Sequence, residues 1–111
     1  MYFEEFKTYV EKNSRAEDIF FTKATDFLEA ENAKRTKQNR WEQSKIDKET
    51  EKMWESTLKN SYAAVVTGIK SEKDKPHFYS HDEEVDYWVS FLNNHEFLEG
   101  FVDGISDTEF D

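Results

Sequence analysis

Between Ile46 and Ile69 the chain reads IDKETEKMWESTLKNSYAAVVTGI, and its apolar residues recur at helical spacing. The residues that share one face, at steps of three, four and seven, are Ile46, Met53, Trp54, Leu58, Tyr62, Val65, Val66 and Ile69. This period predicts an amphipathic α-helix, with Gly68 as its expected stop. The run at 63–66 (AAVV) would also suit a buried strand, but no partner strand is evident, so we expect helix.

Turn-forming residues are scarce in the rest of the chain. The 111 residues include three Gly and one Pro, and residues 1–67 contain neither. A protein built from strands needs such residues every eight to twelve positions, roughly. The composition therefore favours an all-α protein whose helices are joined by polar turns.

Two shorter helices are expected before the long one. The first is an amphipathic helix ending near Asn13, and Ser14 with Glu17 then has the form of a capping box. The apolar stripe of the second helix consists of Ala16, Ile19, Phe20, Ala24, Phe27 and Leu28. Residues 34–40 contain no apolar side chain, so they are either a solvated helical extension or a turn, and Asn39 and Ser44 are candidate caps for the next helix.

After a polar loop at 71–80, interrupted by Pro76, two more helices are expected. Ser80 and Glu83 form a second capping box, ahead of a helix with Val85, Trp88, Val89 and Leu92 facing inward. Asn94 is a candidate cap for a last short helix that holds Phe97, Leu98, Phe101 and Val102 and ends at Gly104.

The predicted architecture is an all-α domain of about five helices over residues 1–105. A long antiparallel helical hairpin would carry short N- and C-terminal helices packed on it. Residues 76–105 would form an acidic C-terminal unit, and residues 106–111 a frayed acidic tail. The side chains expected in the core are Phe20, Phe27, Trp54, Leu58, Tyr62 and Trp88.

Several protein classes are excluded by composition. There is no Cys, which rules out disulfides, thiolate nucleophiles and Cys-based metal sites. No apolar segment is long enough to cross a membrane, and residues 1–5 (MYFEE) do not resemble a signal peptide. We therefore expect a cytoplasmic protein with no membrane association.

The charges are distributed unevenly along the chain. Residues 1–40 contain eight acids and eight bases, residues 41–75 seven of each, and residues 76–111 ten acids with no Lys or Arg. The net charge of −10 therefore lies entirely in the last third. A basic band is also present: Lys34, Arg35, Lys37, Arg40, Lys45 and Lys48, against Glu42 and Asp47.

This asymmetry leads to the main functional hypothesis, a non-enzymatic module that binds a basic protein, as inhibitors, immunity proteins and antitoxins do. The candidate partner-binding residues are Asp82, Glu83, Asp86, Tyr87, Glu99 and Asp103. The competing interpretation is that these acids only maintain solubility, or pair internally with the basic band. Another alternative is a structural accessory protein that forms a homodimer through its helix faces.

The sequence offers fewer features in favour of an enzyme or a metal site than in favour of a protein-binding module. His77 and His81 are four residues apart, but Ser80 as a cap would leave His77 outside the helix. Glu96, Glu99 and Asp103 on one predicted helical face, and Asp47 and Glu51 one turn apart, leave a metal-dependent hydrolase as a further alternative. There is no phosphate loop or nucleophile motif, so we predict no catalytic residue, no metal and no cofactor.

From the sequence alone, we do not expect the basic band to bind nucleic acid. The band has six bases and two acids over residues 33–48, a net charge of +4 on a protein of −10. Phosphate contacts and stacking on Trp41 would have to overcome that overall repulsion.

Overall fold

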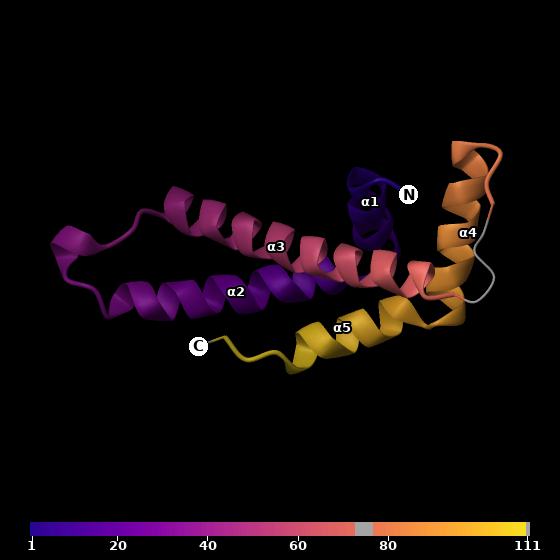
Figure 1. The fold of residues 1–111 in the computed structure, drawn as a ribbon. Helices are drawn as coiled ribbons and strands as arrows, with labels where there is room; N and C mark the ends of the chain where they lie inside the picture. The colour runs from indigo at the N-terminus through magenta and orange to yellow at the C-terminus, as the bar shows by residue number, and fades with distance from the viewer. Residues whose placement is uncertain (73–76, 111) are drawn as a thin grey trace.

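The computed structural model describes residues 1–72 and 77–110, and this part of the chain is all-helical. Its elements are α1 (Phe3–Asn13), α2 (Ala16–Ala33), the 3₁₀ turn η1 (Lys37–Asn39), α3 (Gln43–Lys70), α4 (His81–Asn94) and α5 (Phe97–Asp107). Figure 1 shows α2 and α3 as a long antiparallel hairpin with α1, α4 and α5 packed away from its turn. The predicted fold is confirmed, residues 63–66 are helical, and Pro76 lies outside the described residues.

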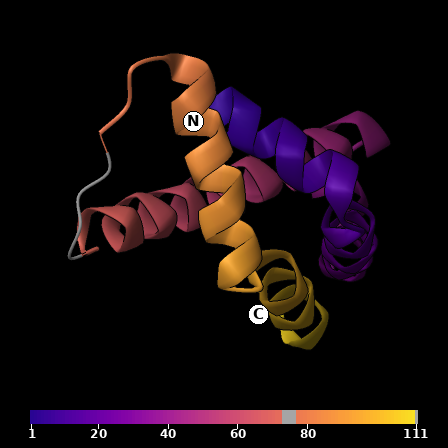
Figure 2. The same ribbon diagram turned by 90° about the vertical axis from the view of Figure 1, so that its right-hand side faces the viewer.

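The molecule is a rod, with overall extents of 58 × 24 × 22 Å. One end is the turn between α2 and α3, and α4 lies across the other end, as Figure 2 shows in a view along the rod. α5 then turns back and runs beside α2 (Figure 1).

Residues 34–40 form the hairpin turn rather than a helical extension. Asn32 fixes the turn, because its side chain accepts the Trp41 N–H at 2.7 Å and donates to the Trp41 carbonyl at 3.0 Å. Neither predicted cap is used: Glu42 precedes α3 without a capping hydrogen bond, and the Asn39 amide bonds the Thr36 hydroxyl instead.

The core lies between α2 and α3 and extends under the three short helices. α2 buries a strict four-residue repeat, Ala16, Phe20, Ala24 and Leu28, and α3 buries Ile46, Thr50, Trp54, Leu58 and Val65. Phe20, Trp54, Leu58 and Trp88 are buried as predicted. Tyr62 and Phe27 are only half-buried.

Both half-buried rings still have aromatic partners. Tyr62 stacks on Trp88 with ring centroids 5.4 Å apart, while its hydroxyl donates to the Met1 carbonyl at 2.7 Å. Phe27 packs on Phe110 at 5.9 Å.

The predicted capping box at the start of α2 is wrong. Arg15 is the residue before α2, and its side chain forms no capping hydrogen bond. Ser14 instead closes α1, since its hydroxyl donates to the Val10 carbonyl at 2.8 Å and accepts the Ala16 N–H at 3.3 Å. Only two residues separate the helices, so one serine serves both ends.

The cap at Ser80 is confirmed, because its hydroxyl accepts the Glu83 N–H at 3.2 Å. The Glu83 carboxylate bonds the Tyr79 N–H at 2.9 Å, one residue earlier than in a standard capping box. Asp82, Glu83 and Glu84 occupy the first turn of α4, where negative charge favours a helix.

Replacing Ser80 by Ala should therefore lower the free energy of unfolding by about 0.5–2 kcal/mol, because one N–H at the start of α4 loses its acceptor. Urea denaturation of Ser80→Ala and of Ser90→Ala, an exposed serine in the interior of α4, is the measurement. Equal stability of the two variants would contradict the assigned cap.

The expected stops at Gly68 and Gly104 are wrong, as is the cap at Asn94. α3 continues to Lys70, and Gly68 lies inside the helix, where a Cβ would lie 3.2 Å from the Phe91 ring. Asn94 ends α4, and the break before α5 falls at Glu96, which has a left-handed φ of 50°. α5 runs past Gly104 to Asp107.

Residues 106–110, for which we expected fraying, contact α2. The Lys23 ammonium donates to the carbonyls of Ile105, Ser106 and Thr108 at the end of α5. Phe110 packs against Phe20 with ring centroids 5.4 Å apart. α5 has no basic residue in its last turn, so α2 supplies the cation that this helix end favours.

Candidate functional site

The candidate partner-binding residues lie on α4 and α5. The five carboxylates, those of Asp82, Glu83, Asp86, Glu99 and Asp103, are exposed, and Tyr87 is half-buried. We call the outer faces of α4 and α5 that carry them the acidic surface. Its aromatic component is Tyr79, which is 84% exposed, while Phe78 and Tyr87 pack against each other at 5.5 Å.

The structure divides this surface into two parts. Asp82, Glu83 and Asp86 belong to the first half of α4, at the far end of the rod. Glu99 and Asp103 line a hollow of about 500 Å³ that also includes Arg15 and Ile19 from α2 and its N-terminal boundary. The change of direction at Glu96 separates the two groups, which the sequence had suggested as one set.

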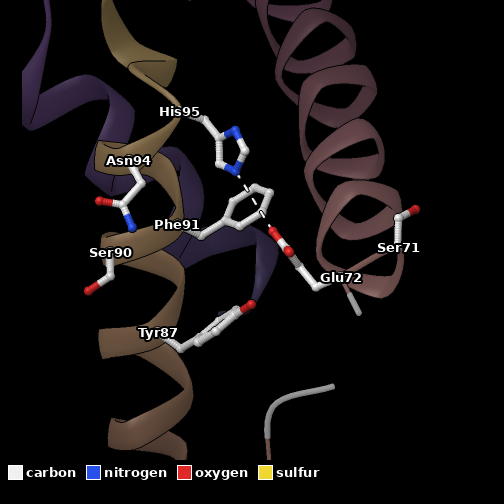
Figure 3. A pocket seen from close by; sticks show the side chains of 7 residues that line it. All are labelled: Ser71, Glu72, Tyr87, Ser90, Phe91, Asn94 and His95. Carbon is white, nitrogen blue, oxygen red and sulfur yellow. Dashed lines mark ion pairs between the residues drawn. The ribbon is translucent and has the colours of Figure 1, made fainter. Parts of the chain in front are cut away.

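A second hollow, of about 570 Å³, lies between the end of α3 and α4, and Figure 3 shows the side chains that line it. Phe91 and Tyr87 form its apolar side, and the His95 ring packs on Phe91 at 4.3 Å. His95 Nε2 lies 3.8 Å from Glu72 Oε1, and the two side chains are 60% and 40% exposed, respectively. Sequence reasoning gave His95 and Glu72 no role, because 23 positions separate them and neither belongs to a motif.

The polar side chains that line this second hollow offer charge and hydrogen bonds. The hydroxyls of Ser71 and Ser90 point away from the imidazole in Figure 3, so neither serine faces His95. Within residues 1–72 and 77–110, no three His, Asp or Glu side chains gather into a possible metal site. His77 and His81 face different neighbours: His77 packs on Tyr79, and His81 stacks on Tyr2 and pairs with Glu5 at 2.8 Å.

The acidic surface does not pair with the basic band. Among the acids of residues 77–110, the structure gives an ion pair only to Glu84, with the Met1 ammonium. The band occupies the hairpin turn and the start of α3, at the opposite end of the rod from α4 (Figure 1). Lys34, the one band residue in an ion pair, bonds its helix neighbour Glu31 at 3.1 Å.

Away from this surface, two carboxyl groups meet at the junction of α1, α2 and α3. Glu11 accepts the indole N–H of Trp54 at 2.9 Å and also hydrogen-bonds the Glu17 carboxyl. That hydrogen bond, burial and repulsion from Glu11 and Asp18 raise the pKa of Glu17 from 4.5 to about 7, against a smaller opposing effect of Lys7. Lys7 itself pairs with Glu55 of α3 at 3.0 Å.

This carboxyl pair should make stability depend on pH. Glu17 stays protonated in the folded protein up to about pH 7 but ionises near pH 4.5 in the unfolded chain. The stability that this group contributes is therefore fully present below pH 4.5 and is lost as the pH rises from 4.5 to about 7. Glu17→Gln keeps a neutral hydrogen-bonding group at all pH values. Urea denaturation from pH 4.5 to 8 should show the variant gaining stability over the parent as pH rises, whereas parallel curves would contradict the shared proton.

Comparison with known protein families, with curated proteins and with solved structures finds no match to this chain. Among the described residues, none of the helices has the length and apolar character needed to span a membrane.

Proposed function

We propose that this protein is a non-enzymatic protein-binding module, of the kind found among inhibitors, immunity proteins and antitoxins. Its acidic surface binds a basic protein partner. The observation that carries the proposal is the position of the basic band, at the far end of a 58 Å rod from the α4 carboxylates. Within residues 1–72 and 77–110, no ion pair joins these carboxylates to the basic band, so the band leaves them available to another molecule.

The shape of the C-terminal end supports the same function. Exposed Tyr79 lies just before the α4 carboxylates, and the hollow lined by Tyr87 and Phe91 offers a partly apolar recess further along the same helix. Carboxylates around aromatic side chains suit a cationic partner surface, since charge accelerates association and aromatic burial supplies affinity.

The proposal is tested by protein capture from an extract of the source cells at two salt concentrations. The test variant is Asp82→Lys/Glu83→Lys/Asp86→Lys, and a second variant, Asp86→Lys/Asp103→Lys, leaves the first turn of α4 unchanged. The matched control reverses three exposed hairpin acids, Asp26→Lys/Glu29→Lys/Glu51→Lys. Each triple variant raises the formal net charge by six, from −10 to −4.

The parent and the control should retain the same basic protein at low salt, and both acidic-surface variants should lose it. Circular dichroism of each variant establishes that the helices are intact. Equal capture by all four proteins, or loss of capture by the hairpin control alone, would contradict an acidic recognition surface.

A further inference from the structure

The turn of the hairpin presents only positive charge at its tip. All four charged residues of positions 34–40 are cations, Lys34, Arg35, Lys37 and Arg40, and the first turns of α3 add Lys45 and Lys48. All of these except half-buried Arg35 are exposed. We call these six residues the basic tip.

The basic tip is ordered by its own contacts. Arg35 lies over the Trp41 ring at 4.2 Å and Lys45 lies over the same ring at 4.5 Å. The Arg40 Nε donates to the Arg35 carbonyl at 3.3 Å, and Asn32 holds the Trp41 backbone. Arg35, Arg40 and Lys45 are thus arranged before any ligand arrives, which reduces the entropy that binding must overcome at these three side chains.

The net charge of −10 does not oppose binding at the basic tip, because most of the excess acids lie far from it along the rod. The α4 carboxylates lie at the other end of a 58 Å molecule, and the screening length at physiological salt is about 8 Å. The α5 acids end beside Lys23, part-way along α2. The acids near the tip are Glu31, Glu42, Asp47 and Glu29. Glu31 already pairs with Lys34, and Glu29 lines a hollow together with Arg40 and Trp41.

We infer that the basic tip is a second interaction surface, which docks end-on against the phosphate backbone of a nucleic-acid duplex. Duplex DNA releases condensed counterions when Lys and Arg contact its phosphates. Exposed ion pairs with another protein, including a second copy of this chain, contribute only about 0–1 kcal/mol each. The same exposed cations therefore gain more from a polyphosphate than from a protein surface.

The basic tip recognises the phosphate charge of the duplex and not its base sequence. Its exposed side chains carry no apolar group that could enter a lipid surface, and two of its own cations already cover Trp41, the one aromatic ring available for base stacking. With the tip docked end-on, the length of the rod places the α4 carboxylates far from the nucleic acid. The inference goes beyond the proposed function and does not depend on it.

The test measures binding of the full chain to a 20-base-pair DNA duplex of arbitrary sequence, by fluorescence anisotropy over a salt series. Four contacts, from Lys34, Lys37, Arg40 and Lys45, predict a Kd that weakens about a hundredfold between roughly 50 and 200 mM salt. Lys34→Glu/Lys37→Glu/Arg40→Glu should weaken binding at least about tenfold. The Gln version of the same three changes should lower the salt slope by about 3.

A matched control reverses three exposed bases outside the tip, Lys12→Glu/Lys52→Glu/Lys59→Glu, and has the same net charge as the Glu tip variant. This control should bind the duplex within about twofold of the parent. Equal losses in both triple variants, or no binding by the parent at 50 mM salt, would overturn the inference. Tip-dependent binding to vesicles of anionic phospholipid without duplex binding would also overturn it, in favour of a membrane surface.

Discussion

Replacing Trp54 by Ala should lower the free energy of unfolding by about 3–5 kcal/mol, the largest effect expected for a single side chain here. Trp54 is 2% exposed and lies at the centre of the core. Its ring is 5.3 Å from Phe20, 6.4 Å from Phe21 and 6.0 Å from Phe101, so it joins α2, α3 and α5. The change also removes the indole donor of the Glu11 carboxylate.

Thermal and urea denaturation, followed by circular dichroism, measure this effect. A domain of this size has a free energy of unfolding of about 5–15 kcal/mol. A loss of about 3–5 kcal/mol should therefore lower the melting temperature of Trp54→Ala by about 10 °C or more relative to the parent. The control is Trp41→Ala, which removes the same side chain from a half-buried position in the hairpin turn and should cost far less. Melting of Trp54→Ala within about 2 °C of the parent would show that the core is wrongly assigned.

The second large effect is expected at Phe6, where Ala should cost about 3–4 kcal/mol. Phe6 is fully buried, and its ring lies 5.5 Å from Tyr62 of α3 and 5.6 Å from Phe97 of α5. This one side chain therefore holds α1 against two other helices, and a cavity there cannot be filled without moving one of them.

Phe3→Ala is the matched control for Phe6→Ala, measured by the same urea denaturation. Phe3 lies one turn earlier on α1, is half-buried and contacts Tyr62 at the edge of the core, with ring centroids 5.6 Å apart. A loss of stability in Phe3→Ala as large as that in Phe6→Ala would contradict the packing of α1.

Periodicity predicted the helices because burial follows one face of each of them. The α3 stripe from Ile46 to Val65 is buried with only one polar member, Thr50, which the apolar pattern missed. Thr50 is accommodated because its hydroxyl donates to the Ile46 carbonyl at 2.9 Å within the helix. A residue that satisfies its own hydrogen bond in this way gives no apolar signal in the sequence.

Helix ends were predicted less well because contacts between helices override local end signals. Gly68 resembles a stop, yet it lies inside α3, where its lack of a side chain leaves room for Phe91 of α4. Ser14 has the sequence of a capping box for α2, but its hydroxyl bonds the Val10 carbonyl at the end of α1 and the Ala16 N–H instead of the Glu17 N–H. Ser80 behaved as predicted, since a loop precedes it and no earlier helix competes for its hydroxyl.

For the acidic surface too, the sequence predicted the local feature, the excess of acids, but not their position in the fold. The excess of acids after residue 76 is visible by counting, and so are the bases of the hairpin turn. Their separation along a 58 Å rod depends on the antiparallel packing of α2 and α3 and on the direction of α4, which composition does not encode. The approach of His95 to Glu72 likewise depends on how α4 packs against α3.

Melting temperature against salt concentration tests most directly whether the acidic surface is free of internal partners. The proteins are the parent and Asp86→Lys/Asp103→Lys, because Asp82, Glu83 and Glu99 lie in first helical turns that favour negative charge. Asp26→Lys/Glu51→Lys is the control with the same net charge.

If the acids of α4 and α5 only repel one another, added salt should raise the melting temperature of the parent. Asp86→Lys/Asp103→Lys should then melt at the same temperature as the parent or higher at low salt, and gain less from added salt. If the acids are instead neutralised within the fold, the parent should lose stability as salt is added, and the double variant should melt well below both the parent and the control. That second result would contradict a carboxylate surface held free for a basic partner.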